Sequence, residues 1–83
     1  MKAKVYVHLK KGVLDPQGMT IQRSLQSLGY DEVSGVRLGK VFEMDLSATD
    51  EARARERLEE MSRRLLSNPV IEDFTVEIVE GES

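Results

Sequence analysis

Three stretches of this chain alternate apolar and polar side chains with a period of two, and that pattern restricts the possible folds more than any other feature. The stretches cover residues 3–9, 42–46 and 74–78. Successive side chains of a β-strand point to opposite faces of the sheet, so each stretch predicts a strand with one buried face. An antiparallel sheet with one covered face and one face open to water is the expected scaffold.

A first helix is expected after the first strand. Asp15 is a suitable N-cap, Pro16 suits the first helical position, and Gly29 suits a left-handed position at the C-terminal end. Between these signals lies an apolar stripe at helical spacing, formed by Ile21, Leu25 and Leu28. This helix is expected to bury its stripe against the sheet.

The second helix shows the clearest pattern. Its cap candidates are Ser47, Thr49 and Asp50, and the Asn68-Pro69 pair ends it because proline restricts the preceding residue. Its apolar stripe consists of Ala54, Leu58, Met61 and Leu65. A final strand is expected over residues 70–79.

Two short strand-like runs separate the helices, at residues 33–38 and 41–46, with Gly39-Lys40 between them. The tight spacing and the glycine predict a β-hairpin. The complete order is then β-α-β-β-α-β. Right-handed crossovers give an α+β two-layer sandwich, a ferredoxin-like antiparallel sheet of four strands with two helices on one face. The second and fourth strands are expected at its edges.

The length of the chain favours self-association. Its 83 residues suit a single domain, expected over residues 1–80, with 81–83 as a frayed C-terminal tail. A domain of this size buries only about 60% of the surface that its unfolded chain exposes. A homo-oligomer would relieve that shortage.

Composition excludes several classes of function. The chain has no cysteine and a single histidine, His8, which excludes disulfides, cysteine nucleophiles and Cys- or His-rich metal sites. A net charge of −3 argues against nucleic acid and anionic membranes as partners. No apolar run approaches the roughly 20 residues that span a bilayer, and the N-terminus lacks a signal-peptide core. The cytoplasm is therefore the expected location.

Three candidate sites each have a simpler structural interpretation, which we favour. The loop 10–18 carries two lysines and two glycines before a helix and could cradle phosphate, but it lacks the Gly-Lys-Ser/Thr of a P-loop. Glu43 and Asp45 share a strand face and could hold Mg²⁺ or act in acid–base chemistry, although solvated acids are commoner. His8 could act as a base, yet spacing places no nucleophile beside it.

The open face of the sheet has two interpretations. It would present Tyr6, Val41 and Val79 among side chains of both charge signs. Such a face is either wholly solvated or a surface that binds another protein.

Three segments together resemble a known family. Residues 12–18 read Gly-Val-Leu-Asp-Pro-Gln-Gly and are followed by Thr20-Ile21, residues 36–43 read Val-Arg-Leu-Gly-Lys-Val-Phe-Glu, and residues 65–72 read Leu-Leu-Ser-Asn-Pro-Val-Ile-Glu. They resemble the signature loop, the hairpin and the helix-to-strand junction of PurS, the small accessory subunit of phosphoribosylformylglycinamidine synthase. The resemblance extends over nearly the whole chain in the right order.

The resemblance implies a role in the fourth step of purine synthesis, where formylglycinamide ribonucleotide becomes formylglycinamidine ribonucleotide. ATP and Mg²⁺ would act in a separate synthetase subunit, and glutamine would be hydrolysed in a separate glutaminase subunit. This chain would hold no catalytic residue, cofactor or metal of its own. As a homodimer or tetramer it would bridge the two larger subunits and help ammonia pass between them.

The expected subunit contacts come from the matching segments, which are rich in glycine and proline rather than in catalytic groups. They are Gly12, Asp15, Pro16, Gly18, Arg37, Gly39, Lys40, Asn68 and Pro69. Two alternatives share the same fold plan. An ACT-like regulatory domain would bind an amino acid at a dimer interface. An acylphosphatase-like enzyme would need an arginine in the loop after the first strand, where this chain has only lysines.

Overall fold

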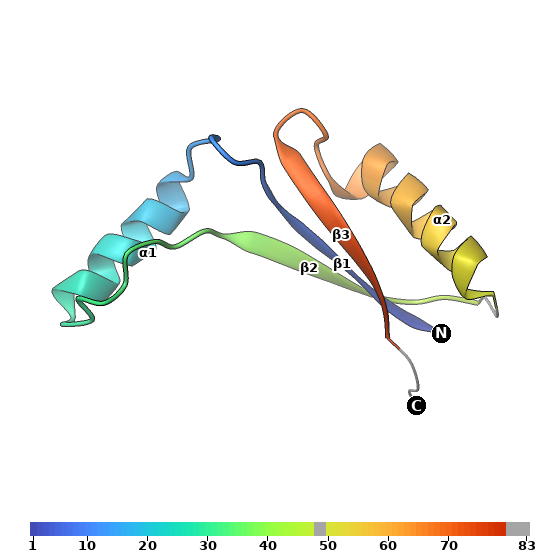
Figure 1. The fold of residues 1–83 in the computed structure, drawn as a ribbon, viewed down its shortest axis with the longest axis horizontal. Coiled ribbons are helices and arrows are strands. Elements are labelled where there is room, and N and C mark those ends of the chain that lie inside the picture. The colour runs from blue at the N-terminus through green and yellow to red at the C-terminus, as the bar shows by residue number, and fades with distance from the viewer. Residues whose placement is uncertain (48–49, 80–83) are drawn as a thin grey trace.

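The computed structural model describes residues 1–47 and 50–79 (Figure 1). The elements follow in the order β1 (Lys2–Leu9), α1 (Pro16–Ser27), β2 (Gly39–Asp45), α2 (Glu51–Met61), a π-helical turn η1 (Ser62–Leu66) and β3 (Glu72–Val79). The caps Asp15 and Asp50 and the left-handed Gly29 are confirmed. Thr49 and the tail 81–83 lie outside the described residues.

The three strands form one antiparallel sheet in the order β2-β1-β3. Val5 of the central strand is paired with Phe42 on one side and with Val76 on the other. Cross-strand partners share a face, so this register gathers the alternating apolar residues of all three strands on one side. The α+β class and the sheet with one apolar face are confirmed.

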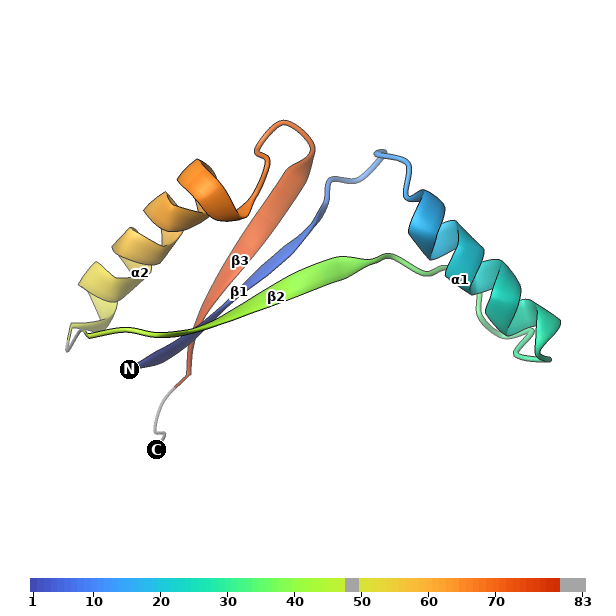
Figure 2. The ribbon, with the colours of Figure 1, turned by 180° about the vertical axis from the view of Figure 1, so that it is seen from behind.

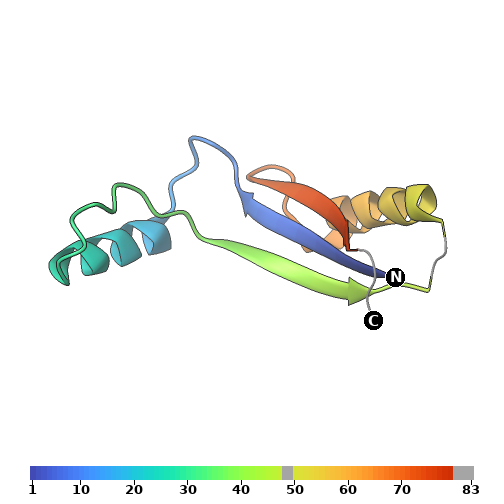
Figure 3. The ribbon, with the colours of Figure 1, turned by 60° about the horizontal axis from the view of Figure 1, so that its bottom comes forward.

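Helix α2 covers only part of that apolar face. Leu58 is fully buried against β1, and α2 packs against β3 rather than β2 (Figures 2 and 3). The fully covered core is small and consists of Ala3, Val5, Val7, Ala54 and Leu58. Phe42, Met44 and Leu46 of β2 and the segment after it are only half-buried. The half of the sheet formed by β2 is therefore left open.

The predicted stripe of α2 is wrong at Leu65. Directly after α2 the helix widens into a π-helical turn, in which the Ser67 N–H donates to the Ser62 carbonyl oxygen at 2.9 Å. A turn of this kind holds one more residue than an α-helical turn. Leu66 therefore packs against the core, whereas Leu65 is 83% exposed.

The predicted second strand and its hairpin are also wrong. Residues 33–38 form no strand, so the sheet has three strands, and Gly39 and Lys40 lie within β2. Apolar residues stand at 33, 36 and 38, which is not a regular period of two, and only the first two are half-buried. This segment lies along α1, where the Gln26 amide donates to the Val33 carbonyl oxygen at 2.7 Å. The last strand begins at Glu72, two residues later than expected.

The position of α1 is the largest departure from the expected fold. Among the described residues, α1 packs extensively against none of the three strands, and it projects beyond the end of the sheet (Figures 1 to 3). We call residues 12–38 the arm. The chain measures 48 × 31 × 14 Å, and its radius of gyration is 16.1 Å. A compact domain of this length would have a radius of about 12 Å, so a single copy is extended.

A side chain of α2 contacts the edge of the sheet formed by β3. Arg55 of α2 donates to the outward carbonyl oxygen of Val76 at 3.2 Å and so occupies the middle of the β3 edge. A sheet edge is a template for pairing unless it is covered. The edge formed by the last strand, β3, is thus partly covered.

Candidate functional site

A buried carboxylate fixes the arm at its base. Asp15 is 7% exposed, and its two oxygens accept hydrogen bonds from the Gly18 N–H at 2.9 Å and from the Leu38 N–H at 2.8 Å. Arg37 lies 3.9 Å from the same carboxylate and donates to the Lys10 carbonyl oxygen at 3.3 Å. We call Lys10, Asp15, Gly18, Arg37 and Leu38 the clasp. These contacts join the segment that leads into α1 to the segment that returns from it to β2.

Gly18 is required for the close fit of the clasp. A Cβ atom on this residue would lie 2.3 Å from the Val36 carbonyl oxygen. Real contacts are never that short, so any side chain here would push α1 away from the returning segment. The packing of α1 against residues 36–38 therefore depends on a glycine.

The clasp also sets the acidity of Asp15. Hydrogen bonds from the Leu38 N–H and then from the Gly18 N–H, with the nearby Arg37 charge, hold the pKa of Asp15 below its ordinary value, although burial opposes this. The clasp therefore needs the ionised carboxylate.

Acid should weaken the clasp. A lowered pKa in the folded state stabilises the fold above the unfolded pKa of about 3.9, and this stabilisation is lost as pH falls through the folded value. We expect the thermal midpoint of the wild-type chain to fall more steeply between about pH 5 and pH 3 than that of Asp15→Asn. Differential scanning fluorimetry across this range measures both slopes. Equal slopes would show that the Asp15 carboxylate does not contribute to the loss of stability in acid.

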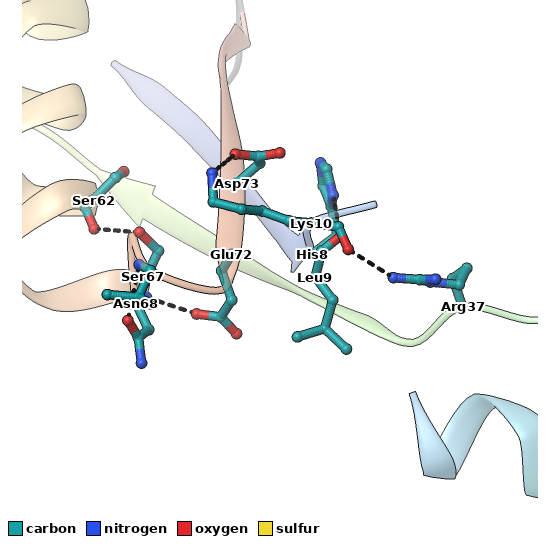
Figure 4. A network of polar contacts seen from close by, with 10 residues as sticks. His8, Leu9, Lys10, Arg37, Ser62, Ser67, Asn68, Glu72 and Asp73 are labelled. Atoms are coloured by element: carbon teal, nitrogen blue, oxygen red, sulfur yellow. Dashed lines mark hydrogen bonds and ion pairs between the residues drawn. The ribbon is translucent and has the colours of Figure 1, made fainter. Parts of the chain in front are cut away.

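A second group of contacts forms at the same end of the sheet (Figure 4). The Lys10 N–H donates to the Ile71 carbonyl oxygen at 2.8 Å, and the Lys10 ammonium pairs with Asp73 at 2.7 Å. Glu72 accepts from the Asn68 N–H at 2.7 Å, while the Asn68 side chain accepts from the Val70 N–H at 3.1 Å. These bonds shape the turn that leads into β3 and hold it beside the end of β1.

The structure brings the nine predicted contact residues to this one end of the sheet. Asp15, Gly18 and Arg37 belong to the clasp, and Asn68 and Pro69 form the turn. Gly39 and Lys40 begin β2, Pro16 begins α1, and Gly12 has a φ of 91° in the exposed loop between β1 and α1. A hollow of about 310 Å³ lies among them, bordered by His8, Asp15, Lys40 and Glu72. Their contact with a partner subunit remains a prediction.

The geometry favours the simpler interpretation of all three chemical candidates. In the loop 10–18, the Gly18 N–H is taken by Asp15 and the Val13 N–H by the Lys10 carbonyl oxygen, so neither is available to a phosphate. Asp45 pairs with Lys2 at 2.8 Å, which lowers its pKa, and no cluster of three metal-ligating acids or histidines occurs within residues 1–47 and 50–79. The His8 ring lies 3.3 Å from the Leu9 carbonyl oxygen.

On the open face of the sheet, a hydrogen bond links side chains of β1 and β3. The Tyr6 hydroxyl donates to the Glu77 carboxylate at 2.6 Å, and this hydrogen bond raises the pKa of Tyr6. Val41 on the same face is 51% exposed. The face thus holds a mixed surface with an apolar side chain at its edge strand, and both earlier interpretations of it stand.

Sequence reasoning missed a groove on the other face. It lies between α2 and the segment that follows β2, has a volume of about 400 Å³, and is bordered by apolar Leu46, Ala54 and Met61. Arg53 and Arg57 form its charged rim, with Asp50 near the start of the helix. In the sequence, the two arginines are four residues apart and therefore share a helix face, and Ala54 and Met61 belong to the predicted apolar stripe.

Comparison with known proteins decides the family. A family model described as PurS, phosphoribosylformylglycinamidine (FGAM) synthase, matches residues 2–80. The chain belongs to the PurS family. The subunit PurS of the same synthase from Synechocystis is 51% identical over 90% of this chain and 75% of the relative. The crystal structure of PurS from Methanocaldococcus jannaschii aligns with a TM-score of 0.88 and 42% identity over 98% of both chains.

Family membership confirms the resemblance inferred from the sequence and the assignment to phosphoribosylformylglycinamidine synthase. A structure of PurLQS from Thermotoga maritima also contains a similar chain, with a TM-score of 0.86 and 32% identity over 94% of this chain and 95% of that one. The ACT-like alternative is not favoured, because the PurS match extends over nearly the whole chain. No helix in the described part of the chain is long and apolar enough to cross a bilayer.

Proposed function

We propose that this PurS-family chain is a non-catalytic subunit that bridges the synthetase and glutaminase subunits of phosphoribosylformylglycinamidine synthase. The observation that supports this most is the arm, a clasped extension whose helix packs against residues 33–38 but, within the described residues, packs extensively against none of the three strands. Such a shape serves contacts with other chains. In two of the candidate chemical sites the polar groups have structural partners: the Gly18 N–H donates to Asp15, and Asp45 pairs with Lys2.

The proposed contribution to the reaction is geometric. Ammonia released into water is diluted and largely protonated, and the protonated form is not a nucleophile. A bridge that fixes the relative position of two active sites keeps ammonia neutral and at high effective concentration between them. ATP and Mg²⁺ act in the synthetase subunit under this proposal, and the chain works in the cytoplasm with no cofactor of its own.

The bridging subunit is proposed to be a homo-oligomer, a dimer or a tetramer. One copy exposes 6134 Å² of surface at a mass of 9.4 kDa. A compact monomer of that mass would expose about 5,000 Å². The excess of roughly 1,100 Å² is of the order that one partner buries in a standard protein interface, about 800 Å².

Reconstitution tests the bridging role. With the synthetase and glutaminase subunits present, we expect glutamine-dependent product formation to fall at least about tenfold when this chain is omitted, because released ammonia then escapes to water. Ammonia-dependent product formation should change much less, since added ammonium chloride bypasses the transfer. Product is measured by chromatography in both assays. Full glutamine-dependent activity without this chain would contradict the proposal.

A further inference from the structure

The two most exposed large apolar side chains of the described residues lie on the short segment that joins α2 to β3. Leu65 is 83% exposed and Val70 is 80% exposed. Five residues of chain span at most about 18 Å. One partner covers about 800 Å² in a standard interface, a patch roughly 30 Å across. A single binding partner can therefore cover both side chains.

The exposure of Leu65 is built into the backbone. The Ser67 N–H and the Ser67 hydroxyl both donate to the Ser62 carbonyl oxygen at 2.9 Å (Figure 4). The buried Ser62 hydroxyl in turn donates to the Leu58 carbonyl oxygen at 2.7 Å. These bonds hold the π-helical turn, which places Leu66 against the core and Leu65 outside it. Turns of this kind are rare and occur frequently at functional sites.

The turn that follows holds Val70 in place. Its N–H donates to the Asn68 side chain at 3.1 Å, and the Asn68 N–H donates to the Glu72 carboxylate at 2.7 Å. The N–H groups of Ile71 and Glu72 both donate to the Asn68 carbonyl oxygen and close the turn. A surface that is ordered before binding loses less conformational entropy when a partner docks. Val70 thus stands on a backbone that is already suited to binding.

Leu65 also departs from the surface pattern of the helix that precedes it. Between residues 51 and 66, every other exposed side chain larger than alanine is charged. A single exposed leucine is ordinary on a protein surface. Here the leucine is followed by a second exposed apolar side chain on the same hydrogen-bonded segment, which is typical of a contact surface.

The available charge beside these two side chains is positive. Arg63 is exposed, and no ion pair engages it within residues 1–47 and 50–79. Its neighbour Arg64 is exposed and pairs with Glu60 at 3.6 Å. The acids of the following turn are occupied, since Glu72 accepts from a backbone N–H and Asp73 pairs with a lysine. A complementary partner would place carboxylates at this position.

A different chain suits this surface better than a second copy does. In a twofold contact the same patch of each copy meets itself. Arg63 and Arg64 of the two copies would then come together, and like charges opposed at an interface weaken it. The bridging role supplies two different chains, the synthetase and the glutaminase subunits.

We propose that residues 63–70 dock one of these two larger subunits, with Leu65 and Val70 in an apolar pocket and Arg63 and Arg64 against carboxylates at its rim. This inference rests on the proposed bridging function and names the surface at which one of its contacts is made. The π-helical turn then has a role in binding, because it turns a leucine away from the core toward the partner.

Three single substitutions test this surface. Leu65→Asp and Val70→Asp each force a carboxylate into the apolar pocket, and Arg63→Glu places like charges together. Each is expected to raise the dissociation constant for the same larger subunit at least about tenfold. Sedimentation velocity of the labelled chain, titrated with the synthetase subunit, with the glutaminase subunit and with both, measures these constants. Losses for all three variants on one subunit support the proposal, and any other pattern overturns it.

Arg53→Glu is the matched control. Arg53 is also exposed and lies ten residues before Arg63, about 15 Å away along the helix. Its reversal should leave the dissociation constant unchanged within about threefold. An equal loss for this control overturns the proposal, because net charge alone would then explain the effect of Arg63→Glu.

Two further measurements keep the result specific. Self-association of the three variants should match that of the wild type, and an equal loss there would make this surface a contact between copies and overturn the proposal. Should Leu65→Asp fail to fold by circular dichroism, Leu65→Gln replaces it. That variant must weaken binding at least about threefold, because it removes apolar surface from the contact, or the docking surface is refuted.

The docking surface and the proposed function fail in different assays. Glutamine-dependent activity of the reconstituted synthase, with and without the wild-type chain, tests the bridging role alone. If this activity requires the chain but the three variants bind both larger subunits like the wild type, only the docking surface is refuted.

Discussion

Leu58→Ala is expected to lower the free energy of unfolding by about 2–5 kcal/mol, enough to unfold much of a domain of this size. Leu58 is completely buried and contacts the apolar residues of β1 that form the centre of the core. Truncation removes the transfer energy of its side chain and leaves a cavity. The core has few other members, so little can collapse into that space.

Chemical denaturation measures this loss, at one fixed protein concentration because the proposed self-association would raise the apparent stability. Leu65→Ala is the control. It removes the same atoms from the same helical segment, but Leu65 is 83% exposed because of the π-helical turn. We expect its effect to stay within about 0.5 kcal/mol. Equal effects at the two positions would contradict the π-helical turn.

Phe42→Asp is expected to weaken self-association at least about 100-fold, because a second chain would have to bury an unpaired carboxylate. Phe42 lies on the open half of the sheet, where it is half-buried in a single copy. Sedimentation velocity across a concentration series measures the dissociation constant. This is the largest effect on assembly that a single substitution should produce.

Val41→Asp provides the comparison, since Val41 is the residue before Phe42 on β2 and points to the opposite face. It should leave the dissociation constant unchanged within about threefold. Ile21→Asp tests whether α1 also takes part in the proposed self-association, and the exposed position of Ile21 makes damage to the single-chain fold small. If neither Phe42→Asp nor Ile21→Asp weakens association, the open half-sheet is not the surface at which copies meet.

Much of the secondary structure could be predicted because its signals are local. The alternation of apolar and polar side chains predicted all three strands, and the N-cap Asp15 together with Pro16 predicted the start of α1 within one residue. Residues 33–38 were misassigned because a short apolar run does not reveal what covers it. Here the covering surface is α1 itself. Leu65 was misassigned because a fixed helical period cannot anticipate one wide turn.

The site could be predicted only in part. Motif resemblance selected Asp15 and Arg37, and the structure places them in one clasp. What they do depends on a hydrogen bond that the Leu38 N–H donates to the Asp15 carboxylate, across 23 positions, which no spacing rule could indicate. Amphipathicity showed that α1 needs a covering surface, but a stripe does not say in which chain that surface lies.

The mass of the free chain in solution tests most directly whether one copy is incomplete. Sedimentation equilibrium of the wild-type chain at micromolar concentration should give two or four times the monomer mass of 9.4 kDa. The proposed homo-oligomer, which would cover the open half-sheet and the exposed side of α1, predicts this result. A species of 9.4 kDa that stays folded at every concentration would contradict it.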